Sequence, residues 1–259
     1  MNFTHGPPEK LPENYYSIPS VFKQMRIFFT RDALSKLANR QYLIISLLGA
    51  PFLAFVIGFF TKHNAGEEYR FCDNENIPAY LFMCVITSLF LGLIISSEEI
   101  LKDRKILKRE SFLNLSWFAY INSKIGMMFI LSAIQTLSFI IVGNLILEIR
   151  GMTVSYWIAL FATACCASMI GLNISSALNS VITIYILIPF IIIPQLLFSG
   201  VLVKYDKLHK LPHSNQEYVP VIGDVMPARW SFEALAVEQF SNNRFSRNFF
   251  PYNLEESQN

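Results

Sequence analysis

Charged residues are missing from four long stretches of this sequence. The chain holds 21 Lys and Arg and 19 Asp and Glu among 259 residues, and 53% of its residues are hydrophobic. None of the charges falls in residues 41–61, 76–97, 125–147 or 151–203. Each run exceeds the roughly 18 uncharged residues that mark a candidate transmembrane helix. This pattern argues against a soluble enzyme.

The same stretches lack the residues on which ion coupling and intramembrane catalysis depend. They contain no Asp, Glu, Lys, Arg or His, whereas a proton-coupled transporter or ion pump normally keeps one at membrane depth. They also lack a His-Glu-x-x-His zinc motif, a Gly-x-Ser-x-Gly nucleophile elbow and an acidic pair. We therefore expect no catalytic residue in this chain, and energy for any transport must come from elsewhere.

Metal, nucleotide and nucleic-acid binding find little support either. The four histidines lie in linkers or loops, and three of the four cysteines fall within the uncharged stretches. Neither set has the spacing of a metal site or a disulfide framework. No P-loop motif is present, and a net charge of +2 provides no field for nucleic acid. We expect no metal and no nucleic-acid partner.

The uncharged runs predict an all-α polytopic membrane bundle with about five transmembrane helices. Because a helix needs roughly 20 residues to cross about 30 Å of hydrocarbon, the first three runs fit one span each. The fourth is too long for one helix, and its polar break at residues 173–180 predicts two spans joined by a tight turn. The transmembrane domain is expected over residues 41–203, with spans at about 41–61, 76–97, 118–147, 152–173 and 180–203.

The distribution of basic residues predicts the orientation in the membrane. Residues 1–40 and 98–124 hold six Lys or Arg each, whereas the loops at 62–75 and 148–150 hold two and one. Since basic loops stay on the cytoplasmic side, we expect a cytoplasmic N-terminus in a plasma or inner membrane. Five spans then place residues 204–259 outside, as an external segment.

Residues 1–40 are expected to form a linker followed by an amphipathic helix. The linker is indicated by three prolines in the first twelve residues. Beyond it, apolar residues recur every three or four positions between basic ones, at Phe22, Met25, Phe29 and Ala33. Such a helix lies in the headgroup layer of the membrane or on a solvated surface. Its position directly before a span favours the membrane.

A dense run of mixed charge, residues 98–110, follows the second predicted span. Nine of its thirteen residues are charged, and Glu98 and Lys102 have the i,i+4 spacing of a helical ion pair. Apolar residues remain among the charges, so a helix here could dock on a soluble partner. The alternative is a solvated loop that follows the positive-inside rule, but its four acids exceed what topology requires.

Three motifs resemble the membrane domain of ATP-binding cassette exporters of the ABC-2 type, and within it the G subfamily of multidrug and sterol half-transporters. The first combines the charged run with residues 120–124 (Tyr-Ile-Asn-Ser-Lys). The second is Phe-Ser-Gly-Val-Leu-Val at 198–203, at the end of the fifth span. The third runs from Pro-Ala-Arg-Trp at 227–230 to Glu-Gln-Phe at 238–240. They occur in the family's order, through nearly the whole chain.

The resemblance also implies where the energy for transport would come from. The helix before the first span would be a connecting helix, and the charged run a coupling helix on a nucleotide-binding domain. That partner domain would bind ATP and Mg, so this chain itself has no cofactor and is not an enzyme alone. The implied coupling residues are Glu98, Glu99, Lys102, Asp103, Arg104, Arg109 and Glu110.

The resemblance also implies a dimer, with itself or with a second membrane domain, that encloses a substrate cavity in the lipid membrane. Its lining would come from the second and fifth spans, and our candidates are Tyr80, Phe82, Met83, Thr87, Tyr185, Pro189, Ile192 and Gln195. Val201 and Leu202 match the apolar pair that closes the cavity exit. Ordinary apolar packing at a helix end is the alternative for that pair.

Two features depart from the family pattern. A sixth span should follow the external segment, yet residues 241–259 contain no apolar run long enough to cross a bilayer. In the family, the nucleotide-binding domain precedes the membrane domain in the same chain, whereas here only a linker precedes the first helix. We expect the permease domain of an ATP-driven exporter that moves a lipophilic or amphipathic substrate by alternating access. The alternatives are a non-transporting membrane anchor or assembly subunit, and a truncated transporter fragment.

Overall fold

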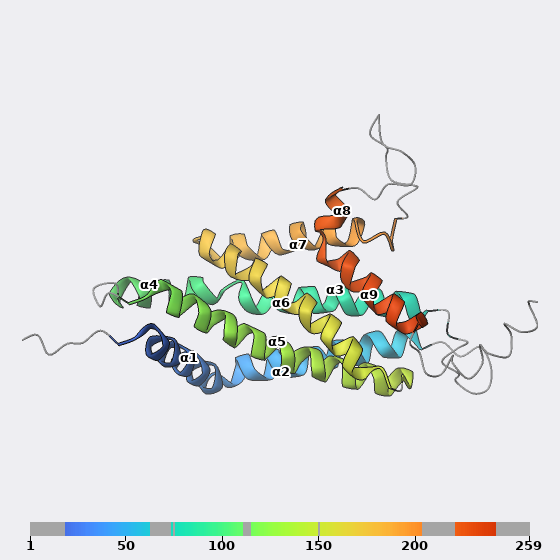
Figure 1. Ribbon diagram of the computed structural model, residues 1–259, viewed down its shortest axis with the longest axis horizontal. Helices are drawn as coiled ribbons and strands as arrows, with labels where there is room; N and C mark the ends of the chain where they lie inside the picture. The colour runs from blue at the N-terminus through green and yellow to red at the C-terminus, as the bar shows by residue number, and fades with distance from the viewer. Residues whose placement is uncertain are drawn as a thin grey trace, which may run out of the picture.

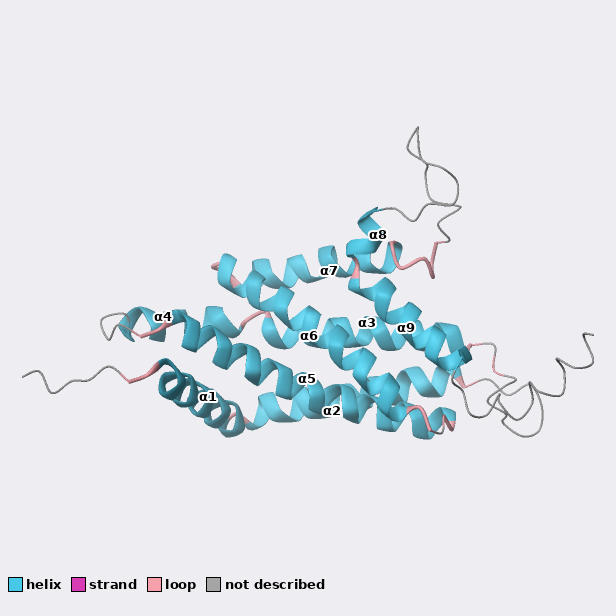
Figure 2. Ribbon diagram, viewed as in Figure 1, coloured by secondary structure: helices cyan, strands magenta, loops and turns pink. Residues whose placement is uncertain are grey.

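The computed structural model describes residues 19–62, 74, 76–110, 115–149, 151–203 and 221–241 of this chain. Within these ranges every regular element is a helix (Figure 2). The helices are α1 (Val21–Ala38), α2 (Arg40–Thr61), α3 (Ile77–Ser96), α4 (Glu99–Glu110), α5 (Trp117–Leu147), α6 (Thr153–Ala177), α7 (Val181–Leu197), α8 (Val221–Val225) and α9 (Pro227–Ser241). The proline-rich start, Cys72 and all four histidines lie outside the described residues.

Four helical segments are long and apolar enough to cross a membrane: Arg40–Thr61, Ile77–Glu110, Trp117–Leu147 and Thr153–Ala177. The second comprises α3 and α4, which are separated by a two-residue turn. α7 is equally apolar but has 17 residues, about 25 Å at ~1.5 Å per residue, and contains Pro189 and Pro194. The predicted polytopic helical bundle, with four to five apolar helices, is confirmed.

The five apolar helices α2, α3, α5, α6 and α7 run along the long axis of the molecule (Figure 1). α1 and α4 lie together at one end of this bundle. α9 lies toward the opposite end, where it packs against α3 and α6. The densest charge of the sequence is therefore gathered at one end of the bundle.

Side chains with an affinity for helix ends fix where α2 and α5 begin. The Asn39 side chain accepts a hydrogen bond from the backbone N–H three residues on, and Ser116 does the same for α5. Asn and Ser are preferred at this position because they satisfy an N–H that has no partner in the first turn. At the other end of α5, Glu148 adopts a left-handed conformation with φ 57°, which stops the helix and turns the chain toward α6.

α3 and α6 approach each other more closely than side chains of ordinary size allow. A Cβ atom on Gly92 would lie 2.6 Å from the backbone oxygen of Ala164 and 2.9 Å from the Cβ of Ala167. About one turn further along α3, Ser96 lies directly against Gly171 of α6. Small residues at helix contacts let the two backbones pack face to face. The α3–α6 contact therefore has no spare volume.

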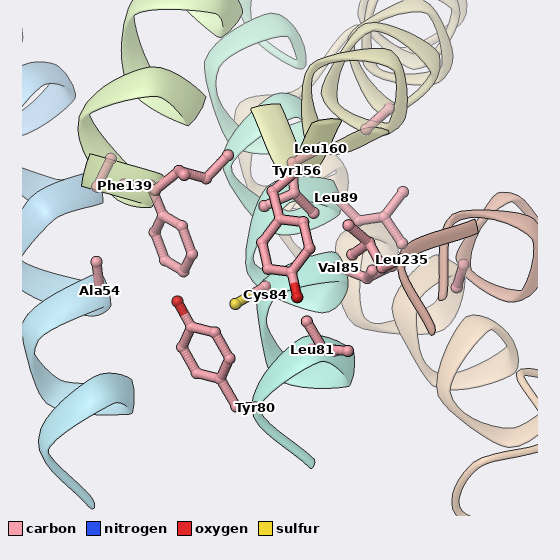
Figure 3. Close-up of a cluster of buried hydrophobic side chains, with 14 of the residues drawn as sticks. Ala54, Tyr80, Leu81, Cys84, Val85, Leu89, Phe139, Tyr156, Leu160 and Leu235 are labelled. Carbon is pink, nitrogen blue, oxygen red and sulfur yellow. The ribbon is translucent and has the colours of Figure 1, made fainter. Parts of the chain in front are cut away.

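The apolar core fills the space between α2, α3, α5 and α6 (Figure 3). Side chains from all four helices meet there with at most 2% of their surface exposed, including Ala54, Tyr80, Leu89, Phe139 and Leu160. Burial of this kind orients each helix about its own axis, because only one face of each is left for lipid.

The end of the described chain packs into the bundle through polar contacts. Ser231 of α9 shares a hydrogen bond with Thr163, which lies about 15 Å along α6 from its first residue at ~1.5 Å per residue. Near the start of α6, Tyr156 donates to Gln239. The side chain of Gln195, from α7, accepts a hydrogen bond from the backbone N–H of Ala228. α9 therefore lies alongside α6 for much of its own length.

Candidate functional site

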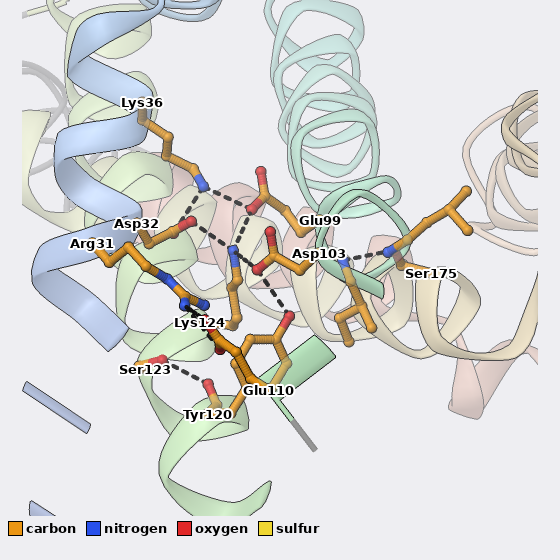
Figure 4. A network of polar contacts seen from close by, with 12 residues as sticks. Arg31, Asp32, Lys36, Glu99, Asp103, Glu110, Tyr120, Ser123, Lys124 and Ser175 are labelled. Atoms are coloured by element: carbon orange, nitrogen blue, oxygen red, sulfur yellow. Dashed lines mark hydrogen bonds and ion pairs between the residues drawn. The ribbon is translucent and has the colours of Figure 1, made fainter. Parts of the chain in front are cut away.

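Three helices bring charged side chains together at one end of the bundle (Figure 4). α1 supplies Asp32 and Lys36, α4 supplies Glu99 and Asp103, and α5 supplies Lys124. None of these five side chains is more than 20% exposed. We refer to them as the buried charge cluster. Its two ammonium groups and three carboxylates give it a formal net charge of −1.

Lys124 occupies the centre of the buried charge cluster. Its Nζ lies 2.6 Å from Oδ1 of Asp32, 2.9 Å from Oδ2 of Asp103 and 3.2 Å from Oε2 of Glu99. Lys36 makes a second bridge, with Nζ 2.7 Å from Oε2 of Glu99 and 2.8 Å from Oδ2 of Asp32. Hydrogen bonds between charged groups are stronger than neutral ones. Each of α1, α4 and α5 is thus joined to the other two by ion pairs.

The charges of the cluster compensate one another. Burial by itself raises the pKa of the Asp32 carboxyl, but the neighbouring ammonium groups of Lys124 and Lys36 outweigh it and bring the pKa below its usual value. Removing two charges from water is costly, and the cost is recovered only when every charge has close partners. Each buried charge of the cluster has such partners, and most of them lie on another helix.

A second layer of contacts surrounds the buried charge cluster. Arg31 of α1 donates from Nη1 to both carboxylate oxygens of Glu110, at 2.8 and 3.0 Å. The Tyr120 hydroxyl donates to Oδ2 of Asp103 at 3.1 Å. The Phe28 ring packs edge-on against the Tyr120 ring, with 5.7 Å between centroids. These contacts hold the far end of α4 against α1 and α5.

α4 is also bound to α6, on its other flank. The Ser175 hydroxyl accepts hydrogen bonds from the backbone N–H groups of Ile100 and Leu101, at 3.0 and 3.1 Å. These are first-turn groups that have no partner within the helix. Arg104 donates to the side chain of Asn179 and to the backbone oxygen of Ser176, at the end of α6. α4 therefore connects α1 and α5 on one side with α6 on the other.

The seven predicted coupling residues all lie in α4 or in the turn before it. Their side chains face different neighbours. Three acids, Glu99, Asp103 and Glu110, face α1 and α5, where they have the contacts given above (Figure 4). Arg104 faces α6. Glu98 and Lys102 pair with each other at 2.6 Å, and Arg109 is exposed. Their role in coupling stays a prediction.

Asp32 and Lys36 are the cluster members that the sequence analysis misses. On pattern alone, the basic residues of α1 face lipid headgroups or water. Lys36 instead is 8% exposed and pairs with Glu99, which lies 63 positions further along the chain. The i,i+4 spacing of Asp32 and Lys36 is a local signal for an ion pair. It contains no indication of the partners on α4 and α5.

The predicted cavity residues differ in their exposure and fall into three groups. The side chains of Tyr80, Phe82 and Gln195 are buried within this protomer, Phe82 against the Phe232 ring of α9. Thr87 and Ile192 are half-buried, and the exposed members are Met83, Tyr185 and Pro189. Of the exposed group, Tyr185 also shares a side-chain hydrogen bond with Glu98.

The predicted gate residues follow the last turn of α7. Leu202 is 63% exposed, and Val201 is half-buried. Beside them is an open pocket of about 310 Å³ between the end of α7 and α9. It is lined by Ser199, Gly200, Arg229, Phe232, Glu233, Ala236 and Val237. The role of Val201 and Leu202 as a gate stays a prediction.

The apolar helices define a polytopic membrane protein, and the buried charge cluster joins α1 and α4 to one end of its bundle. Comparison with known proteins identifies the class. Residues 23–240 match the family described as ABC-2 type transporter, and the chain belongs to this family. Its members' membrane domains are the permease part of transporters that work with ABC ATP-binding domains. The assignment to the G subfamily is finer than this match and stays a prediction.

One curated relative supports the same assignment. The chain is 25% identical over 231 residues to an ABC transporter ATP-binding/permease protein of Mycobacterium tuberculosis (strain ATCC 25618 / H37Rv). The matched region is 84% of this chain and 25% of the relative. This chain thus spans about a quarter of the length of that relative, whose name gives it an ATP-binding part as well as a permease.

Proposed function

We propose that this chain is the permease part of an ATP-driven exporter that moves a lipophilic or amphipathic compound by alternating access. ATP and Mg would bind to a separate ATP-binding domain, which would supply the energy. The observation that carries the proposal is the way α4 is held. A short, highly charged helix at the end of the bundle is bound to α1 and α5 by the buried charge cluster and to α6 by Ser175.

This arrangement supports a route for force from the ATP-binding domain into the membrane. α4 follows α3 after a two-residue turn, contacts α5 through Lys124, and contacts the end of α6 through Arg104. A displacement of α4 cannot leave the other helices unaffected, because it would separate buried opposite charges. Such separation is strongly unfavourable. α4 therefore serves as the coupling helix, and α1 as the connecting helix that braces it.

The substrate path would lie between two membrane domains, in a homodimer or a heterodimer. In this arrangement, Met83 and Thr87 of α3 and Tyr185 and Pro189 of α7 line the cavity, because their side chains reach the surface of the protomer. Tyr80, Phe82 and Gln195 then support the lining from behind. Val201 and Leu202 close the outward exit. The apolar character of these residues suits a lipophilic or amphipathic substrate.

The proposed orientation places α4 and the buried charge cluster on the cytoplasmic side of a plasma or inner membrane. The support is the bias of Lys and Arg toward residues 1–40 and 98–124, whose helices α1 and α4 lie at this end of the bundle. ATP is available on that side. Lipid would cover the outward faces of α2 and α5.

The experiment uses the chain together with the ATP-binding domain of its own gene or of the adjacent reading frame. The complex is reconstituted in proteoliposomes, and both ATP hydrolysis and efflux of a lipophilic dye are measured. Reversal of two charges on α4, R109E/E110R, should lower ATP hydrolysis and efflux together while membrane insertion stays intact. The matched control, Lys62→Met at the other end of α2, should leave both unchanged.

The outcome distinguishes the proposal from its alternative. ATP-dependent efflux that requires an intact α4 supports a coupled permease. If the reconstituted chain neither changes ATP hydrolysis nor moves dye, the proposal is wrong, and a non-transporting anchor or assembly subunit is the better description.

A further inference from the structure

The three acids of α4 and three of its five bases lie on different faces of the helix. The acids Glu99, Asp103 and Glu110 are spaced by four and seven residues, and all three are turned toward α1 and α5. The bases Lys102, Lys105 and Arg109 are spaced by three and four residues, which places them on one stripe of the helix. We call this stripe the basic face of α4. The mixed charge of the sequence is thus separated in three dimensions.

The basic face is exposed, and most of its charge is uncompensated. The side chain of Lys102 is 58% exposed and pairs with Glu98. Lys105 and Arg109 are also exposed, and neither has an ion-pair partner among the residues that the structure describes. The inward acids, in contrast, are all engaged with cations of α1 and α5. A surface with unpaired positive charge attracts a surface of opposite sign.

The apolar side chains of α1 and α4 indicate which of the two helices faces lipid. On α1, five large apolar side chains are exposed: Val21, Phe22, Ile27, Leu34 and Leu37. On α4, Ile106 is the single large apolar side chain that is exposed. A helix that enters the headgroup region buries a broad apolar face. α1 has such a face and α4 does not. The basic face of α4 is therefore suited to contact a soluble protein rather than lipid.

We infer that the basic face of α4 docks on an acidic surface of the ATP-binding domain, with carboxylates opposite Lys105 and Arg109. This inference rests on the proposed function and adds the sign of charge that the partner must present. The inward acids then have a distinct role: they hold α4 in place, while the outward bases recognise the partner. Recognition through exposed charges makes the association fast and sensitive to salt.

The test measures binding of the purified ATP-binding domain to the chain in nanodiscs, at low and at high salt. Nanodiscs of zwitterionic lipid and nanodiscs containing anionic lipid are used in parallel. The variant K105E/R109E should weaken binding about tenfold or more at low salt, since two attractive pairs become repulsive. Its effect should shrink at high salt and be the same in both lipids. The control K23E/R26E reverses two exposed bases on α1 and should bind as the wild type does.

A charge exchange makes the test specific. A photo-crosslinker at Ile106 identifies the residues of the ATP-binding domain that face α4, and replacing the acids found there by Lys should restore binding to K105E/R109E. Thermal unfolding of each variant confirms that these exposed substitutions leave the fold intact. Restored binding supports the inference directly.

Three results would overturn the inference, and they differ from one another. If the wild-type chain does not bind the ATP-binding domain, the proposed function itself is wrong and the inference falls with it. If the wild type binds and K105E/R109E binds equally well at both salt concentrations, the proposed function stands and the acidic partner surface is refuted. If K105E/R109E weakens binding only in nanodiscs with anionic lipid, the basic face contacts lipid headgroups instead.

Discussion

Replacing Lys124 by Met tests whether the buried charge cluster holds α1, α4 and α5 together. Met has a similar length and flexibility, so the change removes the ammonium group with little change in volume. Three carboxylates lose their common partner: those of Asp32, Asp103 and Glu99, at 2.6, 2.9 and 3.2 Å. Lys36 alone remains to balance them, and the formal charge of the cluster changes from −1 to −2.

The expected loss follows from the burial of the group. Removing one partner of a buried ion pair leaves an uncompensated charge and costs about 3–5 kcal/mol. The Lys124 side chain is 3% exposed, so solvent provides little screening. We therefore expect Lys124→Met to lower the free energy of unfolding by about 3–5 kcal/mol. The measurement is reversible unfolding of the purified chain in mixed micelles, followed by circular dichroism.

Lys62→Met is the matched control. Lys62 also forms an ion pair, 3.1 Å from Glu148, but the two side chains are 30% and 52% exposed. Exposed pairs contribute about 0–1 kcal/mol. The reasoning is refuted if the two variants lose equal stability. A double variant that also replaces Asp32 by Asn should recover part of the loss, because it removes one of the unpaired carboxylates.

Four further predictions follow from other contacts. Gly92→Ala should destabilise the chain by about 1–3 kcal/mol, because the new methyl group overpacks against α6. Gly49→Ala should stabilise it by about 0.5–1 kcal/mol, since no atom lies near the new methyl group. Unfolding in micelles measures both changes. The pKa of Asp32 is lower in the folded state, so its stabilising effect is complete above about pH 4 and is lost as the pH falls further. Asp32→Asn should therefore unfold with a shallower acid dependence than the wild type, and equal slopes would contradict this. Ser175→Ala should cost about 1 kcal/mol and weaken ATPase coupling, since two N–H groups of α4 lose their acceptor. Leu202→Ala should raise dye leak from proteoliposomes at an unchanged unfolding temperature; unchanged leak would argue against a gate.

The helices could be predicted from the sequence because the membrane imposes a simple rule on it. A span must be long and uncharged, and residues 41–61 satisfy this without reference to any other part of the chain. The last predicted span, at 180–203, contains the shorter helix α7, and its exact bounds in a membrane stay a prediction. α7 ends at Leu197, with Pro189 at its midpoint and Pro194 near its end. Beyond α7, Gly200 has a φ of 80°, in the left-handed region that commonly follows the end of a helix.

The candidate site could be predicted only in part, because its contacts join distant parts of the chain. The charged run marked α4, and the motif at 120–124 contained Lys124. Nothing in the pattern showed that Asp32 would contact Lys124 across 92 positions. Nor did it show which charges of α4 face inward. Side-chain direction depends on how α4 rotates against α1 and α5, and this rotation is determined by tertiary packing rather than by local sequence.

The glycine contact between α3 and α6 decides where the protomer is stiff. Gly92 lies against the backbone of α6, and tightly packed surfaces neither compress nor slide freely. α4 closes a triangle with these two helices, as the continuation of α3 and as the partner of Ser175 on α6. Because each of these three helices is connected to the other two, they resist sliding past one another. A displacement of α4 would therefore move α3 and α6 together with it.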